Sequence, residues 1–126
     1  MSLQFLTTAH PESLPFWEAA AKGRFLLPRC QACRRAHWYP RAICPLCGSS
    51  DVEWREASGR GTVYSVSVVR RAKPPYALAY VTLDEGPTMM TNIVDCDLDA
   101  VAIGQKVKVL FRDRSDGVAV PLFTPA

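Results

Sequence analysis

The sequence has few of the groups that enzymes use for chemistry, and it has no candidate membrane span. No apolar run approaches the roughly 18 residues that a bilayer crossing needs. No glycine-rich phosphate loop, G-x-S-x-G motif or H-E-x-x-H motif occurs, and the 126 residues include only two histidines. The first residues also lack a basic segment followed by an unbroken apolar run, so we expect no secretory signal. These absences predict a cytoplasmic protein without an active site of its own.

The composition is that of a folded globular protein. Hydrophobic residues make up 48% of the chain and charged residues 21%, which argues against long disordered segments. The length suits one ordinary domain, or a small domain beside a module too small to form a core unaided.

Positive charge is concentrated in the first half of the chain. The net charge is +3, and residues 1–60 carry all of it because residues 61–126 are neutral. Six lysines and arginines, and no acidic residue, lie between Lys22 and Arg41. A basic cluster of this kind suits a phosphate-bearing partner, either a nucleic acid or a phosphorylated cofactor. A solvated loop surface has the same composition, so both interpretations stay open.

Four of the five cysteines form two Cys-x-x-Cys pairs. The pairs are Cys30 with Cys33 and Cys44 with Cys47, and ten residues separate them. In a cytoplasmic protein this pattern favours a metal site over disulfides, and four thiolates close a tetrahedral site that is structural rather than catalytic. Zinc is the expected ion, with iron in a rubredoxin-like site as the alternative. Four thiols make His37 unnecessary as a ligand.

The fifth cysteine is not expected to be reactive. Cys96 lies between Asp95 and Asp97, whose negative charges would raise the thiol pKa and discourage nucleophilic attack. The aspartates at 95, 97 and 99 lack the glycine and distal glutamate that a calcium loop requires. We therefore expect a solvated turn around a small, partly buried cysteine.

The first part of the chain is predicted to form a short helix and a ribbon. The stretch SLPFWEAAAKG indicates a helix with Ser13 as its N-cap and Gly23 as its stop. Strands are expected over 24–28 and 51–56, on either side of the cysteines. The predicted domains are a helical segment at 1–23, a zinc ribbon at 24–57 and a second domain at 58–126.

The second part of the chain has the periodicity of a small β-barrel. A helical turn is expected at 97–104, and turn signals separate the apolar segments. Five strands are predicted, at 62–69, 76–83, 88–94, 106–111 and 118–123. Five strands with a short helical insert before the fourth are typical of an OB-type barrel. The predicted fold class is mainly β, with an N-terminal helix, a four-cysteine zinc ribbon and a C-terminal OB-fold barrel.

Taken in order along the chain, several segments resemble the domain-of-unknown-function 35 family of acyl-CoA-associated OB-fold proteins. They are FWEAAAKGRFLLPRCQAC, WYPRAICPLCGSSDVEWREASGRGTVYS, PPYALAYVTLDEG, IGQKVKVLF and PLFTPA. The resemblance covers nearly the whole chain and implies an N-terminal helix or helical hairpin, a rubredoxin-like zinc ribbon and an OB barrel. It also implies association with thiolase-like enzymes and, in some complexes, help in holding the coenzyme A thioester. The four cysteines match the family's metal ligands, whereas no catalytic residue carries over.

We therefore expect a non-catalytic partner subunit of a thiolase-like acyl-CoA enzyme, which assists assembly and the binding of coenzyme A or acyl-CoA. The basic residues would meet coenzyme A phosphates, and the helix aromatics would meet the partner or the acyl chain. The candidate contacts are Phe16, Trp17, Arg34, Arg35, Arg70, Arg71 and Lys73. Each of them also suits an ordinary surface or self-packing role.

The alternative function is that of a single-stranded nucleic-acid-binding module, because zinc ribbons and OB folds both serve there. Such a module needs exposed aromatic residues beside a basic groove. Tyr64 is expected to face inward with Val66 and Val68, and the barrel half of the chain is neutral. Nucleic acid is therefore the less favoured partner, and a stand-alone enzyme is less favoured still.

Overall fold

The structure is a computed structural model that describes residues 11–113 and 118–126. The first ten residues of the predicted helical segment, His10 among them, and residues 114–117, between the strands expected at 106–111 and 118–123, lie outside this part. The chain divides into two compact units, one built mainly from the residues up to Ser58 and one mainly from Gly59 onward. Each unit is described by itself, and the domain boundaries expected at residues 23 and 57 stay predictions.

The first unit begins with a short helix that depends on its packing. A 3-10 turn, Pro11–Ser13, leads into helix α2, Leu14–Ala20. Seven residues are too few for a stable isolated helix, and Phe16 anchors it with a side chain that is fully buried. Ser13 holds the N-cap position, but its hydroxyl accepts a hydrogen bond from the Trp17 indole (3.2 Å) instead of capping the backbone. None of the described helices is long and apolar enough to cross a membrane.

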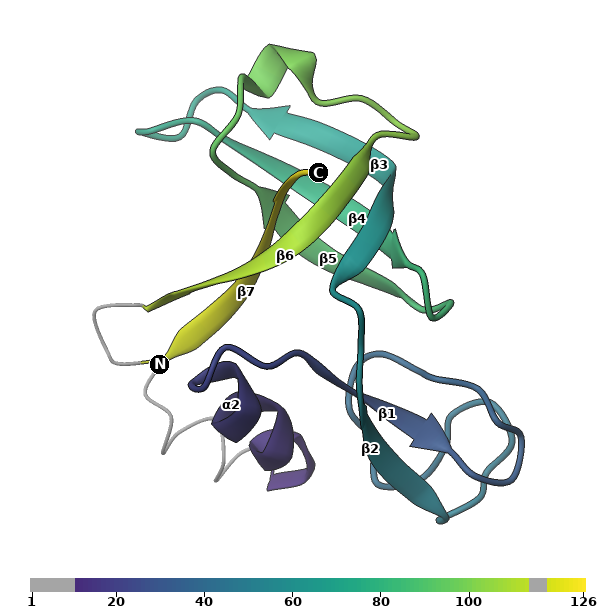
Figure 1. The fold of residues 1–126 in the computed structure, drawn as a ribbon. Helices are drawn as coiled ribbons and strands as arrows, with labels where there is room; N and C mark the ends of the chain where they lie inside the picture. Colours follow the sequence, from purple (N-terminus) through teal and green to yellow (C-terminus); the bar gives the residue numbers. More distant parts are fainter. Residues whose placement is uncertain (1–10, 114–117) are drawn as a thin grey trace. The chain divides into compact units, whose positions relative to one another are not determined.

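Two antiparallel strands form the ribbon that carries the cysteines. Strand β1 is Leu26–Cys30 and strand β2 is Val52–Glu56, paired so that Pro28 lies opposite Trp54 and Arg29 opposite Glu53 (Figure 1). Because side chains alternate along a strand, these two neighbouring pairs project from opposite faces of the ribbon. One face of the ribbon therefore carries the apolar pair and the other carries the charged pair.

The core of the first unit is small and aromatic. The Phe16 ring centroid lies 4.9 Å from that of Trp38 and 6.0 Å from that of Phe25, in edge-to-face geometry. Leu27 of β1 is also buried. A core of this size offers little hydrophobic stabilisation, so the unit needs a second source of stability.

The second unit is a closed barrel with the strand order β3-β4-β5-β7-β6. Its strands are β3 (Arg60–Val69), β4 (Tyr76–Leu83), β5 (Thr88–Ile93), β6 (Lys106–Asp113) and β7 (Ala119–Pro125). A 3-10 turn, Leu98–Ala100, precedes β6, and β5 pairs in parallel with β7 (Figure 1). The predicted fold class is confirmed, including the five barrel strands and the helical insert before the fourth.

Alternating apolar residues fill the barrel. Strand β4 shows this most clearly, because Ala77, Ala79, Val81 and Leu83 are buried while the residues between them are not. Phe123 of β7 is fully buried as well. A strand that turns one face inward and one outward in this way matches a small antiparallel barrel.

Gly61 is required where β3 crosses its neighbours. A Cβ atom at Gly61 would lie 2.6 Å from Cγ1 of Val81 and 2.8 Å from the carbonyl oxygen of Thr82. Gly61 therefore marks a close backbone approach at the start of β3.

A β-bulge in β3 overturns one expectation from the sequence. The pairing of β3 with β4 shifts between Val63 and Ser65, so Tyr64 is the extra residue and is 67% exposed. The prediction that Tyr64 faces inward is wrong, because simple alternation cannot anticipate an inserted residue. Tyr80, which pairs with Ser65 on one side and Met90 on the other, is exposed too, as is Met90.

Candidate metal centre

The four paired cysteines meet at one point of the ribbon. Their sulfur atoms all lie within 4.8 Å of one another. The sulfurs of Cys30 and Cys47 are 3.5 Å apart, and those of Cys33 and Cys44 are 3.8 Å apart. A tetrahedron with metal–sulfur bonds of about 2.3 Å has edges of about 3.8 Å. The sulfur positions therefore fit a single ion held by four thiolates.

Each Cys-x-x-Cys pair sits on the same kind of turn. The Cys30 amide donates to the carbonyl of Arg35 (3.0 Å), and the Cys44 amide donates to the carbonyl of Ser49 (2.8 Å). Both bonds link the first cysteine of a pair to the residue five positions later. The ribbon thus repeats one loop twice, and the two loops face each other across the sulfurs.

A left-handed residue follows each pair. Gly48 has a φ of 82°, which explains why a glycine follows Cys47. Arg34 occupies the equivalent place after Cys33 with a φ of 61°, a conformation that costs a non-glycine residue about 1–2 kcal/mol. The glycine was a visible signal in the sequence, whereas the strained arginine was not.

Backbone amides point at the sulfurs and favour their thiolate forms. The Cys33 amide lies 3.5 Å from the Cys30 sulfur, and the Leu46 amide lies 3.4 Å from the Cys44 sulfur. The Cys33 interaction is the main reason that the pKa of Cys30 is lowered. A bond from the backbone of Arg35 is the main reason that the pKa of Cys33 falls to about 6.

The pKa of Cys47 is raised, in contrast to those of Cys30 and Cys33. The amide of Ser49 favours its thiolate, but the neighbouring Cys30 sulfur, burial and the other two thiols outweigh it and raise the pKa of Cys47 to about 11. Four sulfurs this close cannot all carry negative charge without a cation. A divalent ion supplies that charge and displaces the thiol protons.

The four sulfurs leave no coordination position for a substrate. Cys30 and Cys44 are buried, while Cys33 is partly exposed and Cys47 is exposed. A closed four-sulfur set of this kind stabilises a fold and does not bind a reactant. The arrangement is that of a structural metal centre.

His37 is close in sequence but does not belong to the cluster. The metal-ligating group found among the described residues consists of the four cysteines alone. The His37 side chain is 3% exposed, and neither ring nitrogen has a hydrogen-bond partner in the described part of the chain. Burial lowers the pKa of His37, so the ring is neutral in the folded unit.

Cys96 behaves as the sequence indicates. Burial raises the pKa of its thiol, and the charges of Asp97 and Asp95 add to the effect. The side chain of Asp97 accepts a bond from the Asp99 amide (3.0 Å), which caps the short turn. The segment is an acidic turn around a protonated thiol.

The helix aromatics do not form the exposed surface that we expected. Phe16 is fully buried in the core of the first unit, so its predicted contact with a partner or an acyl chain is wrong in this structure. A helix this short is not stable alone, and the burial of Phe16 helps to hold it in place. Trp17 is partly exposed and remains a candidate contact.

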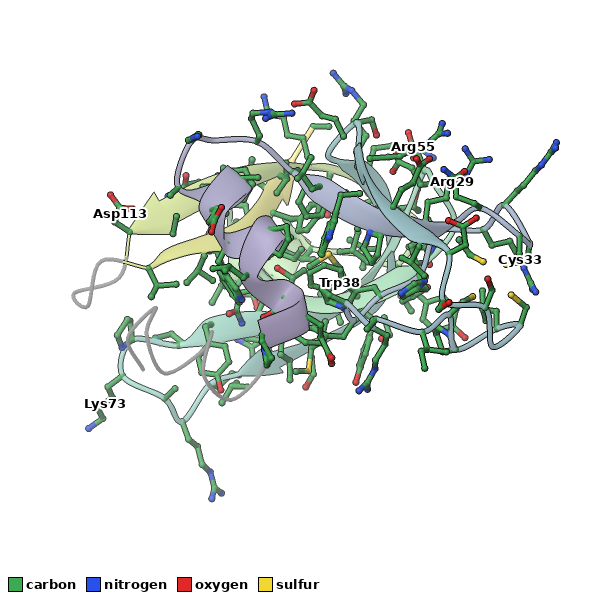
Figure 2. The ribbon with its side chains drawn as sticks, turned by 90° about the horizontal axis from the view of Figure 1, so that it is seen from below. Arg29, Cys33, Trp38, Arg55, Lys73 and Asp113 are labelled. Atoms are coloured by element: carbon green, nitrogen blue, oxygen red, sulfur yellow. The ribbon has the colours of Figure 1, made fainter. Side chains whose placement is uncertain are left out.

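The predicted basic contacts fall into two groups in different units. Arg34 and Arg35 are exposed beside the first cysteine pair. Arg71 and Lys73 are exposed in the loop between β3 and β4, where Lys73 projects away from the chain (Figure 2). Arg70 in the same loop pairs with Asp99 (2.5 Å).

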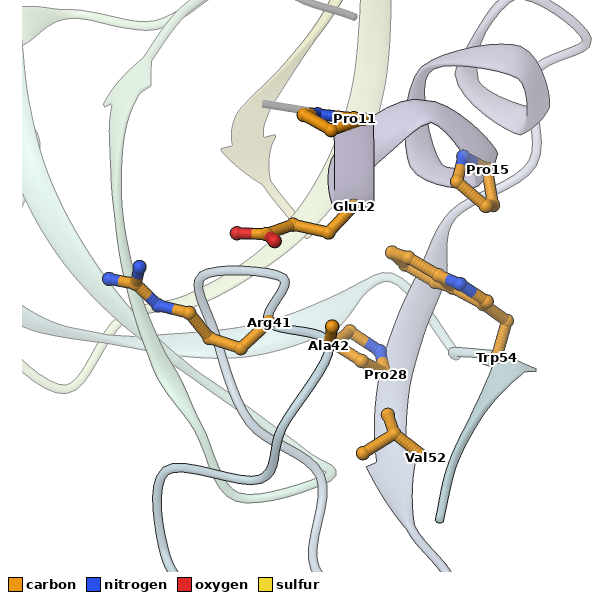
Figure 3. A pocket seen from close by; sticks show the side chains of 8 residues that line it. All are labelled: Pro11, Glu12, Pro15, Pro28, Arg41, Ala42, Val52 and Trp54. Atoms are coloured by element: carbon orange, nitrogen blue, oxygen red, sulfur yellow. The ribbon is translucent and has the colours of Figure 1, made fainter. Parts of the chain in front are cut away.

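Two pockets were not predicted from the sequence, and each is lined by residues of a different face of the ribbon. The pocket in Figure 3 has a volume of about 320 Å³. Its walls are mostly apolar and combine prolines with the Trp54 ring, and it is lined by Pro11, Glu12, Pro15, Pro28, Arg41, Ala42, Val52 and Trp54.

The second pocket is polar and has a volume of about 300 Å³. It is lined by Arg29, Gln31, Arg34 and Arg55. Arg29 and Arg55 lie on the ribbon strands that lead to and from the cysteines (Figure 2). The alternation of polar and apolar residues in PRCQ and VEWRE was the signal for two unlike faces, but the pairing register was needed to see which residues converge.

Family comparisons match both parts of the chain. Residues 17–53 match the family described as the rubredoxin-like zinc ribbon domain of ChsH2. Residues 54–112 match the family described as the C-terminal OB-fold domain of ChsH2.

Curated relatives share about a third of the aligned residues. A probable enoyl-CoA hydratase alpha subunit of Thermomonospora curvata is 37% identical over 117 residues, which cover 88% of this chain and 37% of that protein. The chain thus spans little more than a third of that relative. A DUF35 domain-containing scaffold protein of Methanocaldococcus jannaschii is 38% identical over 101 residues, covering 71% of this chain and 72% of that one.

Solved structures share the fold. A chain of the structure described as "Ltp2-ChsH2(DUF35) aldolase" is 34% identical with a TM-score of 0.80, covering 90% of this chain and 94% of that one. A DUF35-family protein of Sulfolobus solfataricus, of unknown function, has a TM-score of 0.70 at 14% identity and covers 100% of both chains, which supports the fold alone. The two-part match, the four-sulfur centre and the closed barrel agree, and the chain therefore belongs to the DUF35 family of zinc-ribbon and OB-fold proteins.

Proposed function

We propose that the chain is a non-catalytic partner subunit of a thiolase-like acyl-CoA enzyme, which assists assembly and the binding of coenzyme A or acyl-CoA. The observation that carries the proposal is the similarity to the DUF35 chain of an aldolase structure, at 34% identity over 94% of that chain. Relatives named scaffold proteins and a relative named as a hydratase subunit support the same role. The chain's own metal centre is closed, so the chemistry belongs to the partner.

We propose that the metal is a single zinc ion with a structural role. Four sulfurs at tetrahedral spacing suit zinc, and a rubredoxin-like iron site is the alternative. The test is metal analysis of protein purified from its own host. One equivalent of zinc in a colourless protein is expected, and a red protein that absorbs visible light would overturn the zinc assignment.

Five side chains with exposed or partly exposed positions remain candidate contacts with the partner or with coenzyme A. They are Trp17, Arg34, Arg35, Arg71 and Lys73. Arg70 stays a candidate only if its pairing with Asp99 opens. The cytoplasmic location expected from the sequence is part of this proposal.

Affinity purification of the tagged chain from its own host tests the proposed partnership. We expect it to recover an acyl-CoA-processing enzyme of thiolase-like sequence. Cys44→Ser, which removes a buried ligand, should abolish this recovery, whereas Cys96→Ser lies outside the cluster and should not. Recovery of ribosomal or nucleic-acid components alone would contradict the proposal.

The exposed tyrosines of the barrel support a second candidate function, which is binding of single-stranded nucleic acid. Tyr64, Tyr80 and Met90 are exposed, and the inward position of Tyr64 was one of two arguments against this function. Lys106 and Lys108 lie on exposed positions of β6, which pairs with β3. Aromatic platforms beside basic residues are what such modules use. Titration with single-stranded DNA tests it, and affinity that falls steeply with added salt would support it.

A further inference from the structure

Three arginines of the ribbon converge on one polar pocket although they come from three different segments. Arg29 belongs to β1, Arg55 belongs to β2, and Arg34 belongs to the turn after Cys33. Gln31 completes the lining of this pocket, whose volume is about 300 Å³. We call these four residues the arginine pocket.

Hydrogen bonds hold the members of the arginine pocket in place. The Nε atom of Arg29 donates to the carbonyl of Arg34 (3.2 Å). Glu53 uses both carboxylate oxygens, one to pair with Nε of Arg55 and the other to accept a bond from the Gln31 amide (2.5 Å). The bonds to Arg29 and Arg55 use only Nε, so the paired Nη donors of both guanidinium groups make no hydrogen bond within the part of the chain that the structure describes.

The charge of this group suits a doubly charged anion. The pocket's own side chains, which are three guanidinium groups and the Glu53 carboxylate, sum to two positive charges, and the neighbouring four-thiolate centre with a divalent ion carries two negative charges. A phosphate monoester carries close to two negative charges at neutral pH and offers three acceptor oxygens. A single carboxylate would neutralise only one of the two charges. Planar guanidinium groups also bind phosphate oxygens in pairs, which a lysine cluster cannot do.

The same segment holds the first two metal ligands. Arg29 directly precedes Cys30, Gln31 lies between Cys30 and Cys33, and Arg34 directly follows Cys33. Whatever fixes this turn therefore fixes three of the four pocket residues. An anion that binds the formed pocket is linked to metal binding, and each must strengthen the other.

We propose that the arginine pocket binds a phosphate monoester dianion, and that it forms only when the four cysteines hold their metal. One source of this group is the 3′-phosphate of coenzyme A, which rests on the proposed function. The other is the phosphate group of an unrelated ligand. Both sources present the same chemistry to the pocket.

Titration of the metal-loaded protein with inorganic phosphate tests the pocket itself. The readout is the NMR signals of the Nε–H groups of Arg29 and Arg55, at constant ionic strength, with acetate as the singly charged control. We expect saturable shifts with phosphate and much smaller ones with acetate. Arg55→Gln should weaken phosphate binding about tenfold, which corresponds to the loss of one charge-assisted bond.

Two further variants separate binding from folding. Arg34→Gly removes a charge but keeps the left-handed turn, which a glycine adopts without strain, so its folding is preserved and its affinity should fall by a similar factor. Lys22→Gln removes an exposed charge of the same unit outside the pocket and should leave the affinity unchanged. The pocket assignment fails if phosphate shifts neither arginine signal, or if Arg55→Gln and Arg34→Gly bind as the wild type does.

Coenzyme A and dephospho-coenzyme A distinguish the two sources, because they differ only in the 3′-phosphate. If coenzyme A is the source, it binds the wild type about tenfold more tightly than the dephospho form, and Arg55→Gln removes the difference. Equal affinities would exclude coenzyme A as the source, while the phosphate titration alone decides the pocket. A chain that binds phosphate here but recovers no acyl-CoA enzyme would refute the proposed function and keep the pocket.

Discussion

The ribbon and the barrel reach a stable fold by different physical means. The ribbon, taken together with the helix of the same unit, has two five-residue strands, one helix of seven residues and a small aromatic core. The barrel closes five strands on themselves and fills the interior with alternating apolar side chains. We therefore attribute the stability of the ribbon mainly to its metal and that of the barrel mainly to hydrophobic burial.

Removal of a metal ligand is expected to have the largest effect, and only on the ribbon. Cys44 is buried with its sulfur 3.8 Å from that of Cys33, so Cys44→Ser should abolish tight metal binding and unfold the ribbon. Structural zinc sites contribute roughly 10–16 kcal/mol, far more than a small core can replace. Metal stoichiometry together with limited proteolysis measures this. Cys96→Ser is the matched control, and cleavage of both proteins at the same rate would count against the metal's role.

Truncation of each of two buried phenylalanines should destabilise only the unit that contains it. Phe123→Ala removes a fully buried ring from the barrel and Phe16→Ala removes one from the ribbon, and each should cost about 3–5 kcal/mol locally. Denaturant unfolding followed by proteolytic mapping assigns each loss to a unit. We expect Phe123→Ala to keep its metal, since the ligands lie in the other unit. Loss of metal from Phe123→Ala would show that the two units do not differ in this way.

A smaller effect is expected from an added methyl group at Gly61. Its Cβ would lie 2.6 Å from a methyl of Val81 and 2.8 Å from the Thr82 carbonyl, so Gly61→Ala should destabilise the barrel by about 1–3 kcal/mol. Ser67→Ala, on an exposed position of the same strand, is the control. Thermal unfolding monitored by near-ultraviolet circular dichroism gives both values, and equal midpoints would mean that the close approach is absent.

The smallest effect concerns the response of the ribbon to pH. Burial and the nearby charge of Arg41 hold the pKa of His37 below its ordinary value of 6.5. The unfolded chain therefore binds a proton that the folded ribbon does not, and the ribbon loses stability as the pH falls below about 6.5. In chemical denaturation of the metal-loaded protein, the free energy of unfolding should fall less between pH 7.5 and pH 5.5 for His37→Gln than for the wild type. If the free energy of unfolding depends on pH in the same way for the two proteins, His37 does not cause the loss of stability at low pH.

The sequence was sufficient to predict features that depend on one residue type or on one run of apolar residues. The paired cysteines identified the metal ligands that the structure brings together, because thiols at this spacing have few other roles. The apolar run over residues 76–83 predicted β4 to the residue.

Features that depend on strand-pairing register or on side-chain packing could not be predicted from the sequence. Tyr64 faces outward because a bulge shifts the pairing of β3, and no local pattern announces that bulge. Phe16 could equally have been an exposed anchor or a core residue until its neighbours Trp38 and Phe25 were placed around it. The convergence of Arg29 with Arg55 depends on the pairing of two strands that lie more than twenty residues apart in the chain.

Residue-resolved NMR before and after removal of the metal by a chelator tests the contrast between the two units most directly. We predict that the amide signals of Leu26–Cys30 and Val52–Glu56 collapse to unfolded positions, while those of Tyr76–Leu83 keep their dispersion and their protection from exchange. Readdition of zinc should restore the ribbon signals. If the ribbon signals survive chelation, or if the barrel signals are lost together with the ribbon signals, the metal does not stabilise the ribbon alone.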